Sequence, residues 1–242
     1  MRKTSIAAAI FGISVSSAYA GSFETVSPLP DSVVAAPLVD WSGAYVGAFG
    51  AYDFGAINTN DVSAFSAGPR FEIIDISLQS LEGGVLAGYN WQRGNIVFGL
   101  EADYSPGRST KVSLVDTIDL NEVLEWKTNW SASLRARVGF AKNAWLFYGT
   151  AGISKMNAEA GYVRYYDGTR TSIFVDGRAV NDYTGWSAGL GVEKMIGAHL
   201  VVRGEFIQSG YSEVLIPFVP GDLPIGYAPS TSTVRAAVIW RF

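Results

Sequence analysis

Side chains that commonly carry out catalysis are scarce in this sequence. It contains one histidine, His199, and no cysteine among its 242 residues. Serine–histidine triads, cysteine–histidine dyads and multi-histidine metal sites therefore lack the residues that they need. The acids Asp61, Glu72 and Asp75 could exchange protons, but scattered carboxylates of this kind more often only keep a loop solvated. We therefore expect no enzyme activity, no metal site and no cofactor.

A different set of charged residues stands at alternating positions within otherwise apolar segments. Successive side chains of a β-strand point to opposite faces, so alternation puts these charges on one face and the bulky apolar side chains on the other. The set comprises four acids and four bases, namely Glu101, Asp103, Arg135, Arg137, Glu193, Arg203, Glu205 and Arg235. Buried charges persist only when paired, and the planar guanidinium of arginine pairs well with carboxylates. We expect a salt-bridge ladder inside a barrel, acting as a gate, a narrow polar conduit or a solvated structural plug, and we favour the plug.

The elements that would hold these charges are strands, because the chain alternates with period two from Trp41 onward. Most of the alternating segments are close to the roughly 9 to 11 residues with which a tilted strand crosses a bilayer. The eight expected strands span approximately residues 43–53, 82–93, 95–105, 126–141, 144–156, 184–195, 199–210 and 232–242.

Short and long connections alternate between these segments. Short turns are expected around residues 93–95, 142–143 and 197–198. Long loops, which would carry any binding specificity, are expected at 54–81, 106–125, 157–183 and 211–231. This alternation places all short turns at one end of a closed barrel, as in transmembrane barrels with periplasmic turns and external loops. Within the third loop, residues 163–178 could extend the flanking strands as a hairpin that turns at Asp167 and Gly168.

The distribution of large and small residues predicts which face meets lipid. Eight strands enclose a lumen just wide enough for side chains, so a soluble barrel could not pack all the large residues inside. The polar face also carries small residues, namely Gly84, Gly88, Gly99, Gly139, Gly152, Gly189 and Gly191. Aromatic girdles near strand ends are expected from Tyr45, Trp91, Trp126, Trp130, Trp145, Trp186, Trp240 and Phe242. The fold class is predicted to be all-β, an eight-stranded antiparallel up-and-down transmembrane β-barrel.

The final segment, STVRAAVIWRF, is predicted to close the barrel against AYVGAFGAY near the start. An unpaired strand edge cannot lie in hydrocarbon, where no water satisfies its backbone groups. The residues expected to face outward are Val234, Ala236, Val238, Trp240 and Phe242. Those expected to face inward are Thr233, Arg235, Ala237, Ile239 and Arg241.

The N-terminus has the three parts of a secretory signal peptide. Arg2 and Lys3 are basic, residues 6–15 are apolar, and Ala18 and Ala20 form a small-x-small cleavage site before Gly21. Residues 21–40 contain three prolines and no sustained period, which indicates a periplasmic tail or linker before a barrel at 41–242. The net charge of −4 and pI near 5.1 argue against a nucleic-acid partner.

Four stretches resemble the small outer-membrane β-barrel proteins of alphaproteobacteria, which are OmpA-like, porin-like surface antigens and include haem-binding members. They are DWSGAYVGAFGAYDFG, GGVLAGYNWQRGNIVFGLEADYS, RARVGFA and FYGTAGI. The resemblance implies the Gram-negative outer membrane, contact with its lipid and lipopolysaccharide, and possible host surface molecules as partners. It also implies that Trp240 and Phe242 form the C-terminal signal read by the outer-membrane assembly machinery.

Three functions remain open at this stage: a structural surface antigen, a narrow porin for small solutes, and a haem-binding barrel. Haem binding would need loop tyrosines as ligands, because His199 falls in a predicted periplasmic turn. The available tyrosines are Tyr162, Tyr165, Tyr166, Tyr183, Tyr211 and Tyr227. The apolar segment 214–227 could instead contact lipopolysaccharide or another subunit.

Cleavage after Ala20 is directly testable. Mass spectrometry of the protein isolated from outer membranes should find an N-terminal peptide that begins at Gly21. Detection of residues 1–20 on the isolated protein would contradict the signal-peptide prediction.

Overall fold

A computed structural model describes residues 39–63, 70–108, 114–115, 122–165, 173–217 and 225–242. Within them the chain forms a single ten-stranded sheet. The strands are β1 (Gly43–Ser63), β2 (Arg70–Arg93), β3 (Ile96–Arg108), β4 (Leu114–Val115), β5 (Glu122–Lys142), β6 (Trp145–Tyr165), β7 (Ile173–Met195), β8 (Leu200–Tyr211), β9 (Val214–Ile216) and β10 (Ile225–Arg241). No helix in the described part of the chain is long and apolar enough to cross a membrane.

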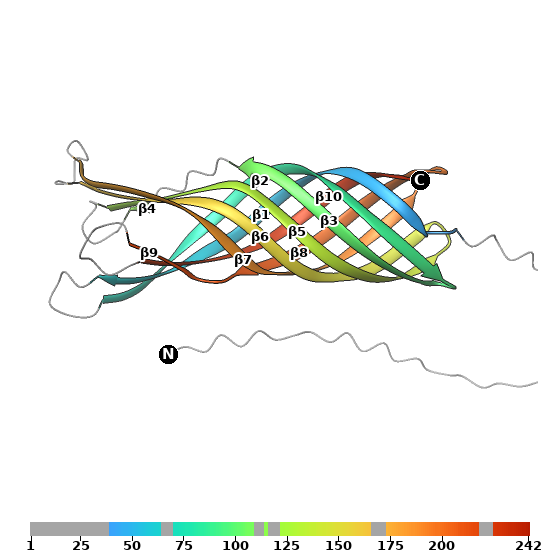
Figure 1. Cartoon of the computed structure of the whole chain (residues 1–242), viewed down its shortest axis with the longest axis horizontal. Helices are drawn as coiled ribbons and strands as arrows, with labels where there is room; N and C mark the ends of the chain where they lie inside the picture. Colours follow the sequence, from blue (N-terminus) through green and yellow to red (C-terminus); the bar gives the residue numbers. More distant parts are fainter. Residues whose placement is uncertain (1–38, 64–69, 109–113, 116–121, 166–172, 218–224) are drawn as a thin grey trace, which may run out of the picture. The chain divides into compact units, whose positions relative to one another are not determined.

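Eight of these strands form a closed antiparallel barrel (Figure 1). The circuit runs β1-β2-β3-β5-β6-β7-β8-β10, and the short strands β4 and β9 pair with β5 and β10 beside it. β10 returns to β1, from Tyr45 opposite Arg241 to Asn60 opposite Gly226. Closure gives every long strand two neighbours, which confirms the predicted fold class and the predicted pairing of the first and last strands.

The three short turns lie at one end of the barrel with the C-terminus, here called the turn end (right in Figure 1). The opposite end is called the loop end. Gly94, between β2 and β3, has φ = 60°, and Asn143, between β5 and β6, has φ = 55°. Glycine and asparagine tolerate this left-handed conformation, which tight hairpin turns require.

The strands are longer at the loop end than the sequence predicted. β1 and β2 remain paired to Ser63 opposite Arg70, and β6 and β7 to Tyr165 opposite Ile173. The predicted loop bounds were therefore wrong, because backbone pairing continues beyond the segments that the alternation in the sequence had marked as strands. The expected hairpin extension is confirmed, although its proposed turn at residues 167–168 lies outside the described residues.

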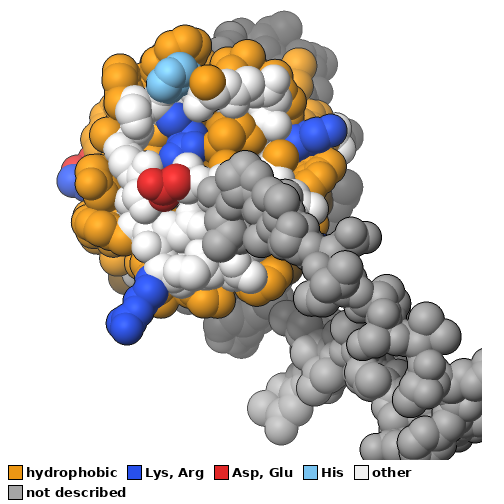
Figure 2. Space-filling model, turned by 90° about the vertical axis from the view of Figure 1, so that its right-hand side faces the viewer, with side chains coloured by type: hydrophobic (Ala, Val, Ile, Leu, Met, Phe, Trp, Pro, Cys, Tyr) orange, Lys and Arg blue, Asp and Glu red, His pale blue; other side chains and the backbone are white. Residues whose placement is uncertain are grey.

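Side chains alternate between a buried inner face and an exposed outer face. On β8, Arg203 and Glu205 are buried, whereas Val202 and Phe206 are exposed. The last strand follows its prediction, with Thr233, Arg235, Ala237, Ile239 and Arg241 buried and Val234, Ala236, Val238, Trp240 and Phe242 exposed. Figure 2 shows the turn end face on, with hydrophobic side chains around its circumference.

Two aromatic residues assigned to the outer girdles point inward instead. Trp126 and Tyr45 are each 2% exposed. The pairing of β5 with β6 shifts by one residue between Thr128 and Trp130. Across such a bulge, the even-numbered residues change from one face of the strand to the other. Trp126 is therefore buried although it shares sequence parity with Trp130. Tyr45 is one of the odd-numbered residues of β1, which face inward, and it points inward although it lies near the end of the strand.

The inward glycines make room for aromatic rings. All seven glycines predicted to face the lumen are buried or half-buried. A Cβ atom at Gly88 would collide with the Tyr45 side chain, and one at Gly191 with the Tyr148 ring. Each ring occupies the space that the missing side chain leaves on the neighbouring strand.

Gly191→Ala should therefore destabilise the barrel by about 1–3 kcal/mol, the usual cost of overpacking a filled core. The free energy of unfolding from urea titrations in liposomes would measure this. Gly50→Ala is the matched control, because Gly50 faces outward and nothing lies within 4 Å of its added Cβ. Equal stability of the two variants would contradict tight packing around Tyr148.

Candidate functional site

The charged cluster at the centre of the lumen is built from cross-strand partners. Three acid–base pairs are directly opposite in the sheet register: Glu101 with Arg135, Glu193 with Arg203, and Glu205 with Arg235. Directly opposite residues have Cβ atoms about 4.5–5.5 Å apart. The strand register alone therefore brings opposite charges into contact.

Arg135 bridges three strands. Its Nη2 atom lies 3.0 Å from Glu101 Oε1 and 2.9 Å from Asp103 Oδ2, and its Nη1 atom lies 3.2 Å from Glu205 Oε1. The Arg135 side chain is 0% exposed. A guanidinium that is fully removed from water is thus paired with three carboxylates.

Glu101 is the acid with the most partners in the cluster. It forms ion pairs at 2.6 Å with Arg203, 3.0 Å with Arg135, 3.5 Å with Arg235 and 3.6 Å with Arg137. Nearer the turn end, Glu193 Oε1 lies 2.6 Å from Arg137 Nη2 and 2.7 Å from Arg203 Nη2. The cluster is a continuous network in which every member has an opposite charge as neighbour.

All eight charged residues predicted for the lumen belong to this network, and residues that were not predicted complete it. The Tyr45 hydroxyl donates a hydrogen bond to Glu101 (2.8 Å) and accepts one from Arg137 (3.1 Å). The Arg137 guanidinium lies 3.9 Å from the centre of the Tyr148 ring. Strand parity places both tyrosines inward and could have identified them from the sequence.

An apolar cluster, here called the turn-end cluster, fills the lumen between the charges and the short turns. It contains Trp41, Val97, Leu146, Val201 and Ile239, all buried. The Arg241 guanidinium lies 5.4 Å from the Trp41 ring and donates hydrogen bonds to the carbonyl oxygens of Asp40 (2.7 Å) and Ser42 (3.0 Å). The last strand therefore holds the segment before β1 in the mouth of the barrel.

An aromatic cluster, here called the loop-end cluster, lies inside the barrel on the other side of the charges. The Trp126 ring centre is 5.2 Å from that of Tyr183 and 6.0 Å from that of Tyr227. All three are buried, as is Ile216 of β9. Two of the six tyrosines considered as haem ligands thus pack inside. Tyr211 is half-buried, the side chains of Tyr162 and Tyr165 are not described, and Tyr166 lies outside the described residues.

The outer wall divides into an apolar band and a charged extension. Toward the turn end, Trp91, Trp145, Trp240 and Phe242 are exposed, and toward the loop end Trp186 is exposed and Trp130 half-buried. Beyond Trp186, Lys155 Nζ lies 2.7 Å from Asp182 Oδ2. Hydrogen bonds from Asn157 and Lys155 hold the pKa of the Asp182 carboxyl below its usual range. An apolar band bordered by aromatics, with a charged wall beyond it, fits a bilayer and the water outside it.

His199 lies at the turn end, where the sequence predicted it. Its ring stacks on Trp240 with centres 5.3 Å apart, and its Nδ1 atom lies 3.0 Å from the Arg241 carbonyl oxygen. It is remote from the loop-end tyrosines.

Known proteins with similar sequences are also outer-membrane proteins. The model of the outer membrane protein beta-barrel domain family matches residues 5–242. The chain belongs to this family. It is 30% identical over 191 residues to the 22 kDa outer membrane protein of Rhizobium leguminosarum bv. viciae, covering 79% of this chain and 74% of the relative. It is 28% identical over 209 residues to the 25 kDa outer-membrane immunogenic protein of Brucella canis, covering 86% and 83%.

Among solved structures, the outer membrane protein OprG from Pseudomonas aeruginosa has the same fold. The TM-score is 0.53 at 10% identity, with 83% of this chain and 97% of that chain covered. The family model and the Rhizobium and Brucella relatives confirm the resemblance to alphaproteobacterial outer-membrane proteins, and the protein is an outer-membrane barrel of a Gram-negative bacterium.

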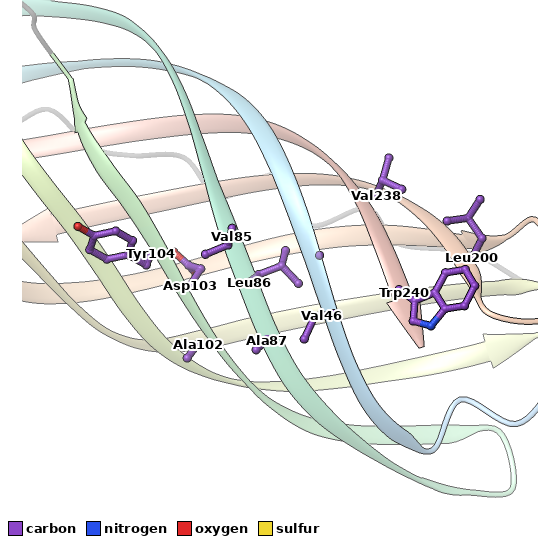
Figure 3. A pocket seen from close by; sticks show the side chains of 11 residues that line it. Val46, Val85, Leu86, Ala87, Ala102, Asp103, Tyr104, Leu200, Val238 and Trp240 are labelled. Atoms are coloured by element: carbon purple, nitrogen blue, oxygen red, sulfur yellow. The ribbon is translucent and has the colours of Figure 1, made fainter. Parts of the chain in front are cut away.

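Because the chain belongs to an outer-membrane family, the apolar outer wall of the barrel faces lipid. A shallow groove on this wall, with Ala87 and Ala102 at its base, lies between Tyr104 and Val85 on one side and Trp240 on the other (Figure 3). Ala87 and Ala102 are cross-strand partners on the outer face of β2 and β3. The groove is a hollow in the lipid-facing surface of this family member and is lined almost entirely by apolar atoms.

Arg135→Ala should lower the free energy of unfolding by about 3–5 kcal/mol, because it leaves buried carboxylates without their shared counter-charge. Lys155→Ala is the matched control, since its ion pair with Asp182 is about half exposed and such pairs contribute at most about 1 kcal/mol. Urea titration of both variants in liposomes measures the difference. Similar losses of unfolding free energy in the two variants would show that the buried network contributes no more to stability than an exposed ion pair.

Proposed function

We propose that this outer-membrane barrel is a structural, surface-exposed component of the cell envelope whose lumen is plugged by its own paired charges. The observation that carries this proposal is the ion-pair network centred on Arg135 and Glu101, whose side chains are 0% and 3% exposed. Rings of charged side chains in a channel act on ions by interacting with them directly. Here the carboxylates and guanidiniums neutralise one another across the lumen.

Two further layers support a closed lumen. The turn-end cluster lies on one side of the network and the loop-end cluster on the other, and both contain tryptophan rings that are at most 2% exposed. A solute would have to displace all three layers. The turn end is assigned to the periplasm and the loop end to the outside, after export with a signal peptide comprising residues 1–20.

A narrow porin is the second candidate, and the geometry of Glu101 favours it. Because Glu101 lies within 3.6 Å of four arginines, its partners could exchange without leaving any charge unpaired. Such an exchange would be the gating step for small ions. The haem-binding alternative gains no comparable support from the described tyrosines.

The partners proposed for this role follow from its surfaces. Outer-membrane lipid and lipopolysaccharide would contact the apolar wall, and host surface molecules would contact the loop end. The name of the Brucella relative, an outer-membrane immunogenic protein, supports exposure at the surface. Trp240 and Phe242, both exposed at the end of β10, would be available to the assembly machinery during biogenesis. No catalytic role is proposed.

Single-channel recording in planar bilayers tests the proposed plug. The refolded protein should give no reproducible conductance steps, while its band shift on heating in gel electrophoresis verifies the folded barrel. Arg135→Ala, measured in the same way, should also give no steps, because the turn-end cluster and the loop-end cluster still close the lumen on either side of the network. Reproducible steps in the unaltered protein that change in Arg135→Ala would contradict the plug and establish the porin.

A further inference from the structure

A small polar cavity lies inside the barrel between the charged cluster and the loop-end cluster. Its volume is about 50 Å³. One side is formed by Arg135, Arg235 and Asp103 of the charged cluster. The remaining wall includes the carboxylate of Glu82 and is rich in hydroxyl groups, from Ser131, Ser133, Ser154, Ser187, Ser209, Tyr211, Thr231 and Thr233. Hydroxyl groups therefore make up most of the lining outside the charged residues.

Two polar atoms of this lining have no hydrogen-bond partner among the described residues. They are the hydroxyl oxygen of Ser187, a residue that is 2% exposed, and the Nε atom of Arg135, a residue that is 1% exposed. A buried polar group without a partner loses the hydrogen bonds that it makes to water in the unfolded chain, which destabilises the fold. Serine is small and its hydroxyl rotates freely, so a partner within the cavity would satisfy it at little cost.

Charge and size decide what that partner is. Each terminal nitrogen of Arg135 already faces carboxylates. The charged residues that line the cavity are two acids, Glu82 and Asp103, and two bases, Arg135 and Arg235, so the cavity attracts neither anions nor cations strongly. The unmet groups are a neutral hydroxyl and a single N–H, which call for a ligand that both donates and accepts. A water molecule needs only about 10–15 Å³ of such space, so the cavity is large enough to hold water.

We propose that this cavity is an internal hydration site that holds water against Ser187 and Arg135, closed toward the outside by the loop-end cluster. Toward the turn end, the charged network and the turn-end cluster shut it off in two layers. Toward the loop end, Trp126, Tyr183 and Tyr227 form the cover, so the aromatic side is the thinner barrier. The proposal rests on the plugged lumen and adds that the plug is solvated from within.

Radiolytic footprinting with mass spectrometry tests the water. Hydroxyl radicals formed from bound water modify the side chains beside it, even where these are buried. Ile207 lines the cavity and is 7% exposed, whereas Ile239 lies in the turn-end cluster and is 2% exposed. Ile207 should be modified on the order of tenfold faster than Ile239, because structural water remains in place in a polar cavity.

Equal modification of Ile207 and Ile239 would overturn the hydration site. Ser187→Val fills the cavity and removes the hydroxyl, so modification of Ile207 should fall to the level of Ile239. Persistence of the parent rate in a folded Ser187→Val barrel would likewise overturn the assignment. These outcomes are separate from the plug itself, since a failed plug gives conductance steps and a dry cavity does not.

Cysteine accessibility tests the cover. The chain has no cysteine, so Ser187→Cys provides a single thiol inside the cavity. A charged, membrane-impermeant methanethiosulfonate should label it only after unfolding. Adding Trp126→Ala should accelerate labelling on the order of tenfold, because access no longer waits for local opening of the cluster. Trp186→Ala is the matched control, being 54% exposed on the outer wall, and should leave the rate unchanged.

Rapid labelling of Ser187→Cys in the otherwise unaltered barrel would overturn the closed cover. The same conclusion follows if Trp126→Ala and Trp186→Ala have equal effects. If the thiol of Ser187→Cys is protected from labelling except when Trp126→Ala is added, the proposed cover is supported.

Discussion

Eight strands that close on themselves enclose a lumen only wide enough for side chains, and this narrowness governs the rest of the molecule. Closure is required because backbone groups at a strand edge find no partner in hydrocarbon. Once β10 pairs with β1, each inward side chain must fit against those of the other strands. Gly88 and Gly191 fit by having no side chain where the Tyr45 and Tyr148 rings lie. The charged residues fit by pairing.

The charged network constrains this fold more than it adds to its net stability. Moving two charges out of water costs several kcal/mol per ion, and a good pairing geometry only offsets that cost. Removing one partner is much more damaging than never having the pair, because the remaining charge stays buried. The network around Arg135 and Glu101 is therefore best understood as a constraint on strand register and lumen packing. It contributes less as a source of net stability.

Strand parity explains both what the sequence could predict and what it could not. The alternation in STVRAAVIWRF assigned each residue of β10 to its observed face, and the same parity brought together Glu101, Arg135 and their six charged companions. Trp126 was misassigned because a bulge near Thr128 reverses parity, and bulges leave little trace in residue pattern. The extensions of β6 and β7 were missed because most of their described exposed side chains are charged, namely Asp176, Arg178 and Asp182, which weakens the period-two signal although backbone pairing continues. Tyr45 was misassigned because its closeness to a strand end outweighed its parity.

The layered interior links the fold to the proposed role. An apolar turn-end cluster, a paired charge network and a loop-end aromatic cluster follow one another along the lumen, so the wall and the loops are the surfaces left to interact with the environment. The central claim is that the lumen charges are coupled and not merely adjacent. A double-mutant cycle on Glu193 and Arg203, whose Oε1 and Nη2 atoms are 2.7 Å apart, tests it most directly. Unfolding free energies of Glu193→Gln, Arg203→Met and the double variant should give a coupling energy of about 1.5 kcal/mol or more, as for other close charge pairs that are removed from water. Additive effects of the two substitutions would contradict the account.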